Sequence, residues 1–400
     1  MAGNRVTTEP TTLNDHSGNR VSVVIPTYNY SHFILDAVKS ALAQDVHDVQ
    51  IIVVDDGSTD NTSDIIKPYT DRIKYIYQEN AGLSAARNTG VRNSTGEFIL
   101  FLDADDVLGP NSIASQVSFF ERNPGAAVVV CENRLFEETD DHGSPKESGT
   151  WELYRKNLAV HLCYFNIAPP HAFLFRRQAI IKTGWFDDQL TACEDYDLWI
   201  RAAVKGFIPH YNPSGVVYYR RHPKSMSADL VNQHLHDAIL HNRLARLLDQ
   251  YPDFPNGNRV EGLLAFSAGA ILTSSRLLGH SLTGASELMQ LALKHIEEVK
   301  KLVKSQKSGW NVLTKLFYFR ICEFLSYPCF RDFSETKVIH ENLWQILLTL
   351  NAPKSKIGLL IDGVKSRVTG PSELLLERRE LAGLVWQYTR NSIFSRVSPG

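Results

Sequence analysis

The chain has 400 residues, of which 43% are hydrophobic and 22% are charged. This length accommodates two domains. Lys and Arg total 42 against 44 Asp and Glu, so the chain has no bulk positive field, which argues against a function based on general attraction to nucleic acid. The five cysteines form neither a Cys-x-x-Cys pair nor an even set, so we expect reduced core thiols in a cytoplasmic protein.

Residues 1–20 are polar and lack the apolar run of a signal peptide, so we predict a disordered leader there. Nowhere do the roughly 18 uncharged apolar residues of a membrane-spanning helix occur together. Any membrane contact is therefore expected to be peripheral, at the inner face.

Short β-branched runs alternate with amphipathic segments over the first third of the chain. Strands are predicted at 21–25, 50–54, 73–77, 97–102 and 126–131, and helices at 33–42, before Pro68, at 83–91 and at 111–122. This rhythm predicts an α/β fold with a mostly parallel sheet and helices on both faces. Its ligand crevice should lie at the carboxyl ends of the strands.

The pattern changes twice further along. A polar stretch at 137–148 predicts a mobile loop, after which strands are expected at 171–175, 207–211 and 216–220 and a helix at 194–205. From residue 228 onward the sequence is typical of helices, at 235–248, 262–278, 286–303 and 312–325. We therefore predict two domains, 21–227 and a C-terminal α-helical region, 228–400.

The helical region has no motif that assigns it a task. It could recruit an acceptor, form an oligomer or lie on a membrane surface, and a packed helical core with solvated charges is the alternative. The best candidates for a partner or lipid surface are 359–364 and 374–386, which have basic residues beside them.

The first of three acidic clusters follows the second strand, as Asp55-Asp56-Gly57-Ser58-Thr59-Asp60. Carboxylates at a strand end can accept hydrogen bonds from a nucleobase or a ribose, and Gly57 permits the turn that directs them. The alternative is an Asx turn with a helix cap at Asp60.

The second cluster, Asp103-Ala104-Asp105-Asp106, ends the apolar run 98–102. Two carboxylates separated by one residue can chelate a hard divalent cation and leave positions for phosphate oxygens. Without a cation the three negative charges repel one another. A lone Asp-x-Asp is common in ordinary turns. The prediction of a cation site therefore depends on the position of this pair at the end of a buried strand.

The third cluster, Glu194-Asp195-Tyr196-Asp197, opens a helix, where carboxylates cap free amides and interact well with the dipole. A capping box would explain Glu194 or Asp195 but hardly both. Two basic segments accompany the acidic ones. Arg87 follows the small residues of 80–86 and could grip a phosphate, and the segment 218–225 could neutralise a diphosphate. Close helix packing and a solvated basic turn are the respective alternatives.

Five motifs in this order resemble a known family. They are Val-Val-Ile-Pro-Thr-Tyr-Asn at 23–29, Val-Asp-Asp-Gly-Ser-Thr-Asp at 54–60, Gly-Leu-Ser-Ala-Ala-Arg-Asn at 82–88, Phe-Leu-Asp-Ala-Asp-Asp at 101–106 and Glu-Asp-Tyr-Asp-Leu-Trp at 194–199. Together they are similar to the inverting glycosyltransferases of family 2, which have the nucleotide-sugar-binding GT-A fold. The resemblance covers roughly residues 21–227.

The resemblance implies a role for each matching position. The residues expected to bind the nucleotide sugar are Pro26, Thr27 and Tyr28 beside the nucleotide, Asp56 at the base, Arg87 near the ribose or diphosphate, Asp103, Asp105 and His222. The metal is assigned to Asp105 as the direct ligand, to Asp103, nearer the ribose, and to His222. Asp195 is expected to be the general base, with Glu194 as its neighbour.

The function implied is transfer of a sugar from a nucleotide-diphosphate donor, a UDP-sugar, to a hydroxyl of a glycan, glycolipid or protein with Mn2+ or Mg2+, in glycan or cell-surface polysaccharide biosynthesis. Processive synthesis is not expected, because the Gln-x-x-Arg-Trp signature and membrane spans are lacking. A non-catalytic nucleotide-sugar-binding scaffold and a sugar-phosphate nucleotidyltransferase are the alternatives. A dehydrogenase is disfavoured because Pro26-Thr-Tyr-Asn-Tyr30 replaces Gly-x-Gly-x-x-Gly after the first strand.

Overall fold

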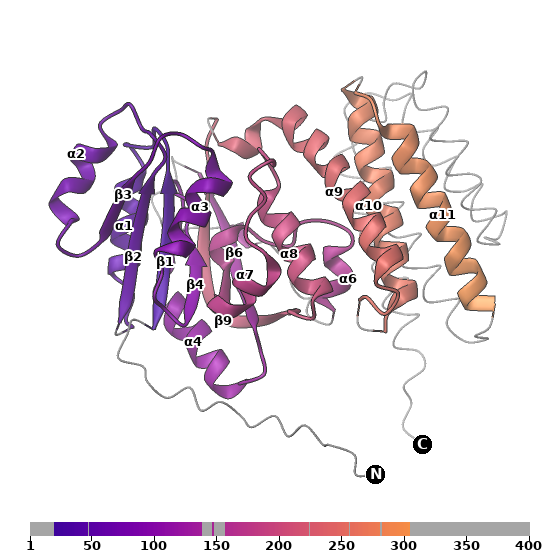
Figure 1. Ribbon diagram of the computed structural model, residues 1–400, viewed down its shortest axis with the longest axis horizontal. Coiled ribbons are helices and arrows are strands. Elements are labelled where there is room, and N and C mark those ends of the chain that lie inside the picture. Colours follow the sequence, from indigo (N-terminus) through magenta and orange to yellow (C-terminus); the bar gives the residue numbers. More distant parts are fainter. Residues whose placement is uncertain are drawn as a thin grey trace, which may run out of the picture. The chain divides into compact units, whose positions relative to one another are not determined.

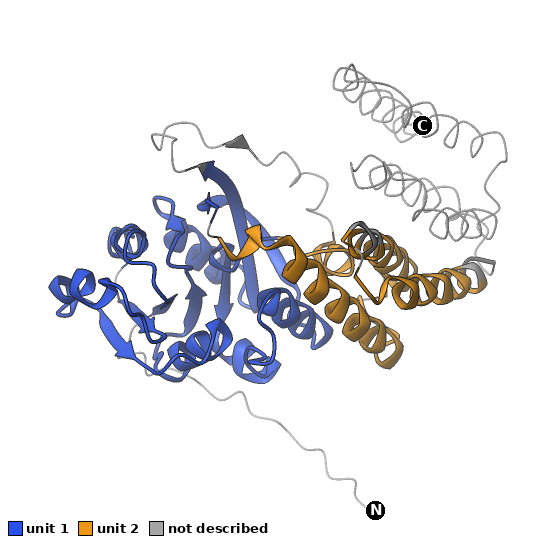
Figure 2. Cartoon of the chain, turned by 90° about the horizontal axis from the view of Figure 1, so that it is seen from above, with its two compact units in different colours: residues 1–156, 168–223 blue, residues 157–167, 224–400 orange. Residues whose placement is uncertain are grey.

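The computed structural model describes residues 20–137, 146–147 and 157–304, except positions 47, 224, 256 and 281. The chain divides into unit 1, residues 1–156 and 168–223, and unit 2, residues 157–167 and 224–400 (Figure 2). The sequence placed this boundary after residue 227 and did not predict that 157–167 groups with the helical unit. The predicted leader, most of the 137–148 loop, the 312–325 helix and the segments 359–364 and 374–386 lie outside the described residues.

Unit 1 contains one sheet (Figure 1). Its strands are β1 (Val21–Thr27), β2 (Val49–Asp55), β3 (Lys74–Tyr77), β4 (Phe98–Phe101), β5 (Val107–Leu108), β6 (Val128–Glu137), β7 (Lys146–Glu147), β8 (Phe173–Arg176) and β9 (Pro209–Arg221). The strand order is β3-β2-β1-β4-β8-β6-β9-β5, and β7 pairs with β6.

The sheet is parallel in one half and mixed in the other. Strands β3, β2, β1 and β4 run parallel, whereas β8 runs antiparallel to both of its neighbours, β4 and β6. Every residue of the central strands β1 and β4 is buried, as expected for parallel strands that helices cover, whereas the edge strand β3 is partly exposed. The predicted α/β fold is confirmed, but the sheet is less parallel than expected. The two strands expected at 207–211 and 216–220 are one strand, β9, with a pairing irregularity opposite Cys131 and Glu132.

The helices of unit 1 follow the predicted amphipathic segments except for α7, which was not predicted from the sequence. They are α1 (Ile34–Leu42), α2 (Thr62–Ile66), α3 (Leu83–Arg92), α4 (Ser112–Arg122), α7 (Arg177–Thr183) and α8 (Glu194–Val204), with short 3-10 turns η1 (Lys67–Tyr69) and η2 (Pro170–Ala172). Helix α3 packs closely on β1 at Gly90, where a Cβ would lie 2.1 Å from the Cγ1 of Val24. This contact brings the start of α3 beneath the ends of the parallel strands.

Unit 2 consists of helices α6 (Leu158–Leu162), α9 (Leu230–Gln250), α10 (Arg259–Gly279) and α11 (Ala285–Lys304), and the 3-10 turn η3 (Met226–Ala228). Gly269 of α10 explains why 157–167 belongs to this unit, since a Cβ there would lie 2.4 Å from the carbonyl oxygen of Tyr164. None of the described helices has the length and apolarity needed to cross a bilayer.

Candidate active site

The carboxyl ends of β1, β2 and β3 lie side by side, because Thr27 pairs with Asp55 and Asp55 with Tyr77. Pro26 and Thr27 are buried at the end of β1, and Tyr28, the next residue, is 46% exposed. Within the described part of the chain, the buried Thr27 hydroxyl has no hydrogen-bond partner. Buried hydroxyls are normally paired, so this one points to a ligand group at the strand end.

Asp56 holds the loop that leads into α3. It is 3% exposed, and its carboxylate accepts hydrogen bonds from the Nε2 of Gln78 at 2.6 Å and from the amides of Ala81 and Gly82 at 3.0 and 2.8 Å. Gly57 permits this arrangement because it has a φ of 83° and a Cβ there would lie 2.9 Å from the Asn80 amide. The carboxylate predicted to bind a base thus also fixes the adjacent loop.

Asp60 takes the role that the sequence left open as its alternative. Its Oδ1 accepts hydrogen bonds from the amide and hydroxyl of Thr62 at the start of α2, and its Oδ2 accepts one from the amide of Ser31. This carboxylate therefore joins the loops after β1 and β2 and forms an Asx turn before α2, whose N-cap residue is Asn61.

The loop 103–106 follows β4 and carries the Asp-x-Asp pair. The Oδ2 of Asp105 lies 3.0 Å from the Nε2 of His222, whose side chain is 3% exposed. The ring of Phe33 packs against His222 with 4.6 Å between centroids. The pKa of Asp105 lies well above its usual range because the carboxyl is buried and Asp106 and Asp103 carry like charges.

Asp105 and His222 are in direct hydrogen-bond contact, and the same separation would suit two ligands of one divalent ion. Adjacent ligands on an octahedral ion with bonds near 2.1 Å are about 3 Å apart, which matches the separation between Asp105 and His222. Oxygen and imidazole ligands together suit Mn2+. The predicted metal residues Asp105 and His222 therefore fit a cation.

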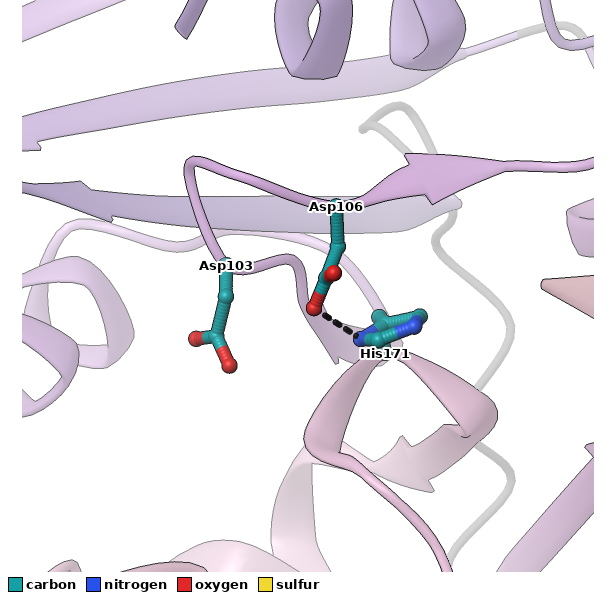
Figure 3. Close-up of side chains that lie close together, drawn as sticks. All are labelled: Asp103, Asp106 and His171. Carbon is teal, nitrogen blue, oxygen red and sulfur yellow. Dashed lines mark ion pairs between the residues drawn. The ribbon is translucent and has the colours of Figure 1, made fainter. Parts of the chain in front are cut away.

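Asp106, at the end of the same loop, is completely buried and occupied by protein contacts. Its Oδ1 accepts a hydrogen bond from the Arg220 amide at 2.8 Å, and its Oδ2 lies 3.1 Å from the Nδ1 of His171 (Figure 3). Burial raises the pKa of Asp106, and His171 opposes that shift. No sequence motif pointed to His171, which stands alone before a short strand.

Asp103 and His171 also lie near Asp106. One potential ligand atom from each of the three residues falls within 4.8 Å of the others. In Figure 3 the Asp106 carboxylate lies between the Asp103 carboxylate and the ring of His171.

Arg87 joins the second and third acidic clusters. Its guanidinium is buried, pairs with the Oδ1 of Asp103 at 2.6 Å and with the Oε1 of Glu194, and lies over the ring of Phe186. Burial alone would lower the pKa of Arg87, but Asp103 and Glu194 raise it above its ordinary value. The residue predicted to approach the ribose or diphosphate is therefore paired, on both its terminal nitrogens, with carboxylates of the protein.

Helix α8 positions the third cluster. Cys193 precedes it in the left-handed conformation, with a φ of 56°, and Trp199 stacks on Phe173 and Phe175 of β8 with centroids 4.4 and 4.9 Å apart. Asp195 is 9% exposed, whereas its neighbour Glu194 is 2% exposed. The structure thus brings Asp195 and Glu194 next to the Asp-x-Asp loop through Arg87.

Comparison with known proteins shows the family of the chain. The family described as "Glycosyl transferase family 2" matches residues 22–184. An uncharacterised glycosyltransferase of Rickettsia prowazekii is 31% identical over 247 residues, which cover 59% of this chain and 70% of that protein. The chain belongs to glycosyl transferase family 2. It is accordingly a glycosyltransferase, and the donor of this family is a nucleotide sugar.

Two further proteins are similar to parts of this chain. Chondroitin synthase of Escherichia coli is 32% identical over 198 residues, which cover 48% of this chain and 28% of the synthase. The mannosyltransferase of Pyrobaculum calidifontis, solved in complex with GDP-Man and Mn2+, has 16% sequence identity and a TM-score of 0.48, covering 84% of this chain and 87% of that one. Several Rickettsia relatives are spanned less completely, the R. typhi protein over 58% of its length and the R. felis protein over 36%.

Proposed function

We propose that unit 1 transfers a sugar from a nucleotide-diphosphate donor, a UDP-sugar, to an acceptor hydroxyl by an inverting, non-processive, metal-dependent reaction. The observation that carries this proposal is that the loop 103–106 contacts both the candidate metal residue His222 and, through Arg87, the start of α8. Asp105 and His222 have the spacing of two ligands on one divalent ion, and Arg87 links the same loop to the helix that begins with Glu194 and Asp195.

The donor occupies the carboxyl ends of the parallel strands. Thr27 offers an unpaired hydroxyl and Tyr28 an exposed ring beside the nucleotide, while Asp56 contacts the base from the loop it holds. Asp105 and His222 would hold Mn2+ or Mg2+, with Asp103 near the ribose. Such an ion would supply Lewis-acid stabilisation of the negative charge that develops on the departing diphosphate.

Asp195 acts on the acceptor. The acceptor oxygen attacks the anomeric carbon from the face opposite the diphosphate, its C–O bond forms while the bond to the diphosphate breaks, and Asp195 takes up the hydroxyl proton. Glu194 is the weaker candidate for this base because its carboxylate is committed to the buried guanidinium of Arg87. The products are the glycosylated acceptor and a nucleoside diphosphate.

Arg87 acts through the two carboxylates it joins. Because it is buried between Asp103 and Glu194, it fixes the distance between the donor loop and the start of α8. A fixed distance matters because a displacement of about 1 Å between reacting groups can cost a hundredfold in rate. The proposed acceptor is a hydroxyl of a glycan, glycolipid or protein in polysaccharide biosynthesis.

A donor screen tests the proposal. The intact chain is incubated with a panel of UDP- and GDP-sugars, with Mn2+ or with excess chelator, and the release of nucleoside diphosphate is measured. We expect release from one donor with Mn2+, no release with chelator, and loss of release in Asp105→Ala but not in Asp71→Ala, an exposed control.

Each alternative activity has its own result in this screen. Pyrophosphate released from a nucleoside triphosphate and a sugar phosphate would identify a nucleotidyltransferase. Donor binding without release, in the presence of acceptor glycans, would favour a scaffold. Full release in excess chelator would contradict the metal assignment.

A further inference from the structure

Arg220 of β9 lies two residues before His222 and contacts the loop 103–106 in two ways. Its backbone amide donates to the Oδ1 of Asp106 at 2.8 Å, and its side-chain Nε donates to the carbonyl oxygen of Asp105, also at 2.8 Å. One residue therefore binds both the carboxylate and the main chain of the loop that carries the metal ligand.

These contacts continue a strand ladder beyond its end. Strands β5 and β9 pair antiparallel, with Val107 opposite Tyr218, so extending the register by two residues places Asp105 opposite Arg220. The backbone ladder stops before that point, and the side chains of Asp106 and Arg220 supply the cross-strand hydrogen bonds there. These two hydrogen bonds hold the loop 103–106 against β9 beyond the last backbone pair of the ladder.

The direction of the Arg220 side chain is itself fixed. Its guanidinium lies between the rings of Phe33 and Phe136, 4.7 Å from each centroid, and its Nη2 donates to the Oδ2 of Asp36 at 2.9 Å. The side chain is 7% exposed, which strengthens such cation–π contacts. Phe33 also packs on His222, so one ring contacts both the arginine and the imidazole.

His171 holds the loop through the second oxygen of Asp106. Its Nδ1 lies 3.1 Å from that oxygen, both side chains are completely buried, and the ring stacks on Tyr219 of β9. Asp106 is thus bound by the amide of Arg220 on one oxygen and by His171 on the other. The contact with His171 is an ion-pair contact, because neither the Oδ2 of Asp106 nor the Nδ1 of His171 makes a hydrogen bond within the described residues.

From these contacts we propose that Arg220, Asp106 and His171, here called the loop clamp, are positioning residues that set the separation between Asp105 and His222. The clamp keeps the two ligand atoms about 3 Å apart before the ion arrives, the spacing that an octahedral ion needs, so ion binding does not have to order the loop. This inference rests on the metal site of the proposed function. The clamp residues support the ligands and do not contact the ion.

The test compares two arginines in closely similar surroundings. Arg176 resembles Arg220, because its Nε donates to a carbonyl oxygen, that of Ala126, its terminal nitrogen pairs with the carboxylate of Glu97, and its guanidinium lies over two phenylalanine rings. Among the described residues, none of its hydrogen-bond, ion-pair or ring partners lies in the loop 103–106. Arg220→Lys and Arg176→Lys therefore remove the same kind of interactions, but only the first loosens the clamp.

The measurement is Mn2+ binding to the intact chain in the presence of UDP, followed by electron paramagnetic resonance. Loss of a residue that orients metal ligands typically costs about 10- to 100-fold in metal affinity. We expect that loss in Arg220→Lys, a loss in Asp106→Asn, and wild-type affinity in Arg176→Lys. Circular dichroism melts of all variants verify that each is folded.

The outcomes separate the clamp from the metal site itself. If Asp105→Ala loses Mn2+ while folded Arg220→Lys and Asp106→Asn bind it as the wild type does, the site stands and the clamp is wrong. If the wild type takes up no Mn2+ with UDP, both proposals fall. An imidazole nitrogen bound to Mn2+ modulates the electron spin echo of the ion. This modulation should disappear in His222→Ala and persist in His171→Gln. The reverse result would make His171 a metal ligand and overturn the clamp.

Discussion

Replacing Arg87 by Met removes the cation that joins two acidic clusters and leaves the side chain nearly the same length. Glu194 is buried and Asp103 is 23% exposed at its side chain, so the uncompensated charge falls mainly on Glu194. Removing one partner of a buried ion pair typically costs about 3–5 kcal/mol. Since domains are stable by about 5–15 kcal/mol, we expect Arg87→Met to lose a large fraction of the stability of unit 1.

Two further variants serve as controls for the stability lost in Arg87→Met. Arg20→Met removes an arginine from an exposed pair, in which Arg20 and Glu121 are 41% and 52% exposed, and should cost at most about 1 kcal/mol. The double variant Arg87→Met with Glu194→Gln removes the buried charge together with its partner. It should recover part of the loss, with a coupling energy of about 0.5–3 kcal/mol between the two positions.

The assay is urea unfolding of the intact chain, followed by far-ultraviolet circular dichroism, with unit 1 and unit 2 transitions fitted separately. An Arg87→Met variant that loses no more stability than Arg20→Met would refute the buried pairing. So would a double variant whose loss is the sum of the two single losses.

Two predictions concern packing and pH. Gly90→Ala should cost about 1–3 kcal/mol by overpacking against the buried Val24. In the Val24→Ala background the same change should cost less, because the two methyl carbons at 2.1 and 2.9 Å are removed and only the Cβ at 3.1 Å remains; urea unfolding measures both. Burial lowers the pKa of His241 and of His295 in unit 2, so the unfolded chain binds more protons below about pH 6.5 and stability falls as the pH falls from there. Thermal melts should show this loss of stability at low pH. The loss should be smaller in His241→Gln and His295→Gln but unchanged in His210→Gln, an exposed control. An equal loss in all three variants would contradict the prediction.

The parallel half of the fold could be predicted because its information is local. Runs such as 50–54 are apolar and β-branched, and an acidic cluster follows directly. A few neighbouring residues therefore predict both the strand and the position of its carboxylates. The reversal of β8 could not be predicted this way. A four-residue apolar strand has the same pattern in either direction, and only its neighbours β4 and β6 decide the pairing.

The contacts of the candidate site depend on long-range partners. Arg87 pairs with Glu194, 107 residues away, so its motif could suggest a phosphate contact but not this ion pair. His171 and Asp106 are likewise distant in sequence, and a single histidine beside an apolar strand is ordinarily a core residue. The grouping of 157–167 with unit 2 depends on Gly269, more than 100 residues further along.

The most direct test of the central claim, that unit 1 has a donor side at Asp105 and His222 and an acceptor side at Asp195, is a paired measurement on Asp195→Asn. Asn keeps the size of the side chain at the start of α8 but cannot take up the acceptor proton at neutral pH. Donor affinity is measured by calorimetric titration with Mn2+ and transfer by product formation, both with the donor identified in the screen. We expect unchanged donor affinity and transfer reduced by about a hundredfold to ten-thousandfold. Near-normal transfer, or loss of donor binding, would contradict this division of the site.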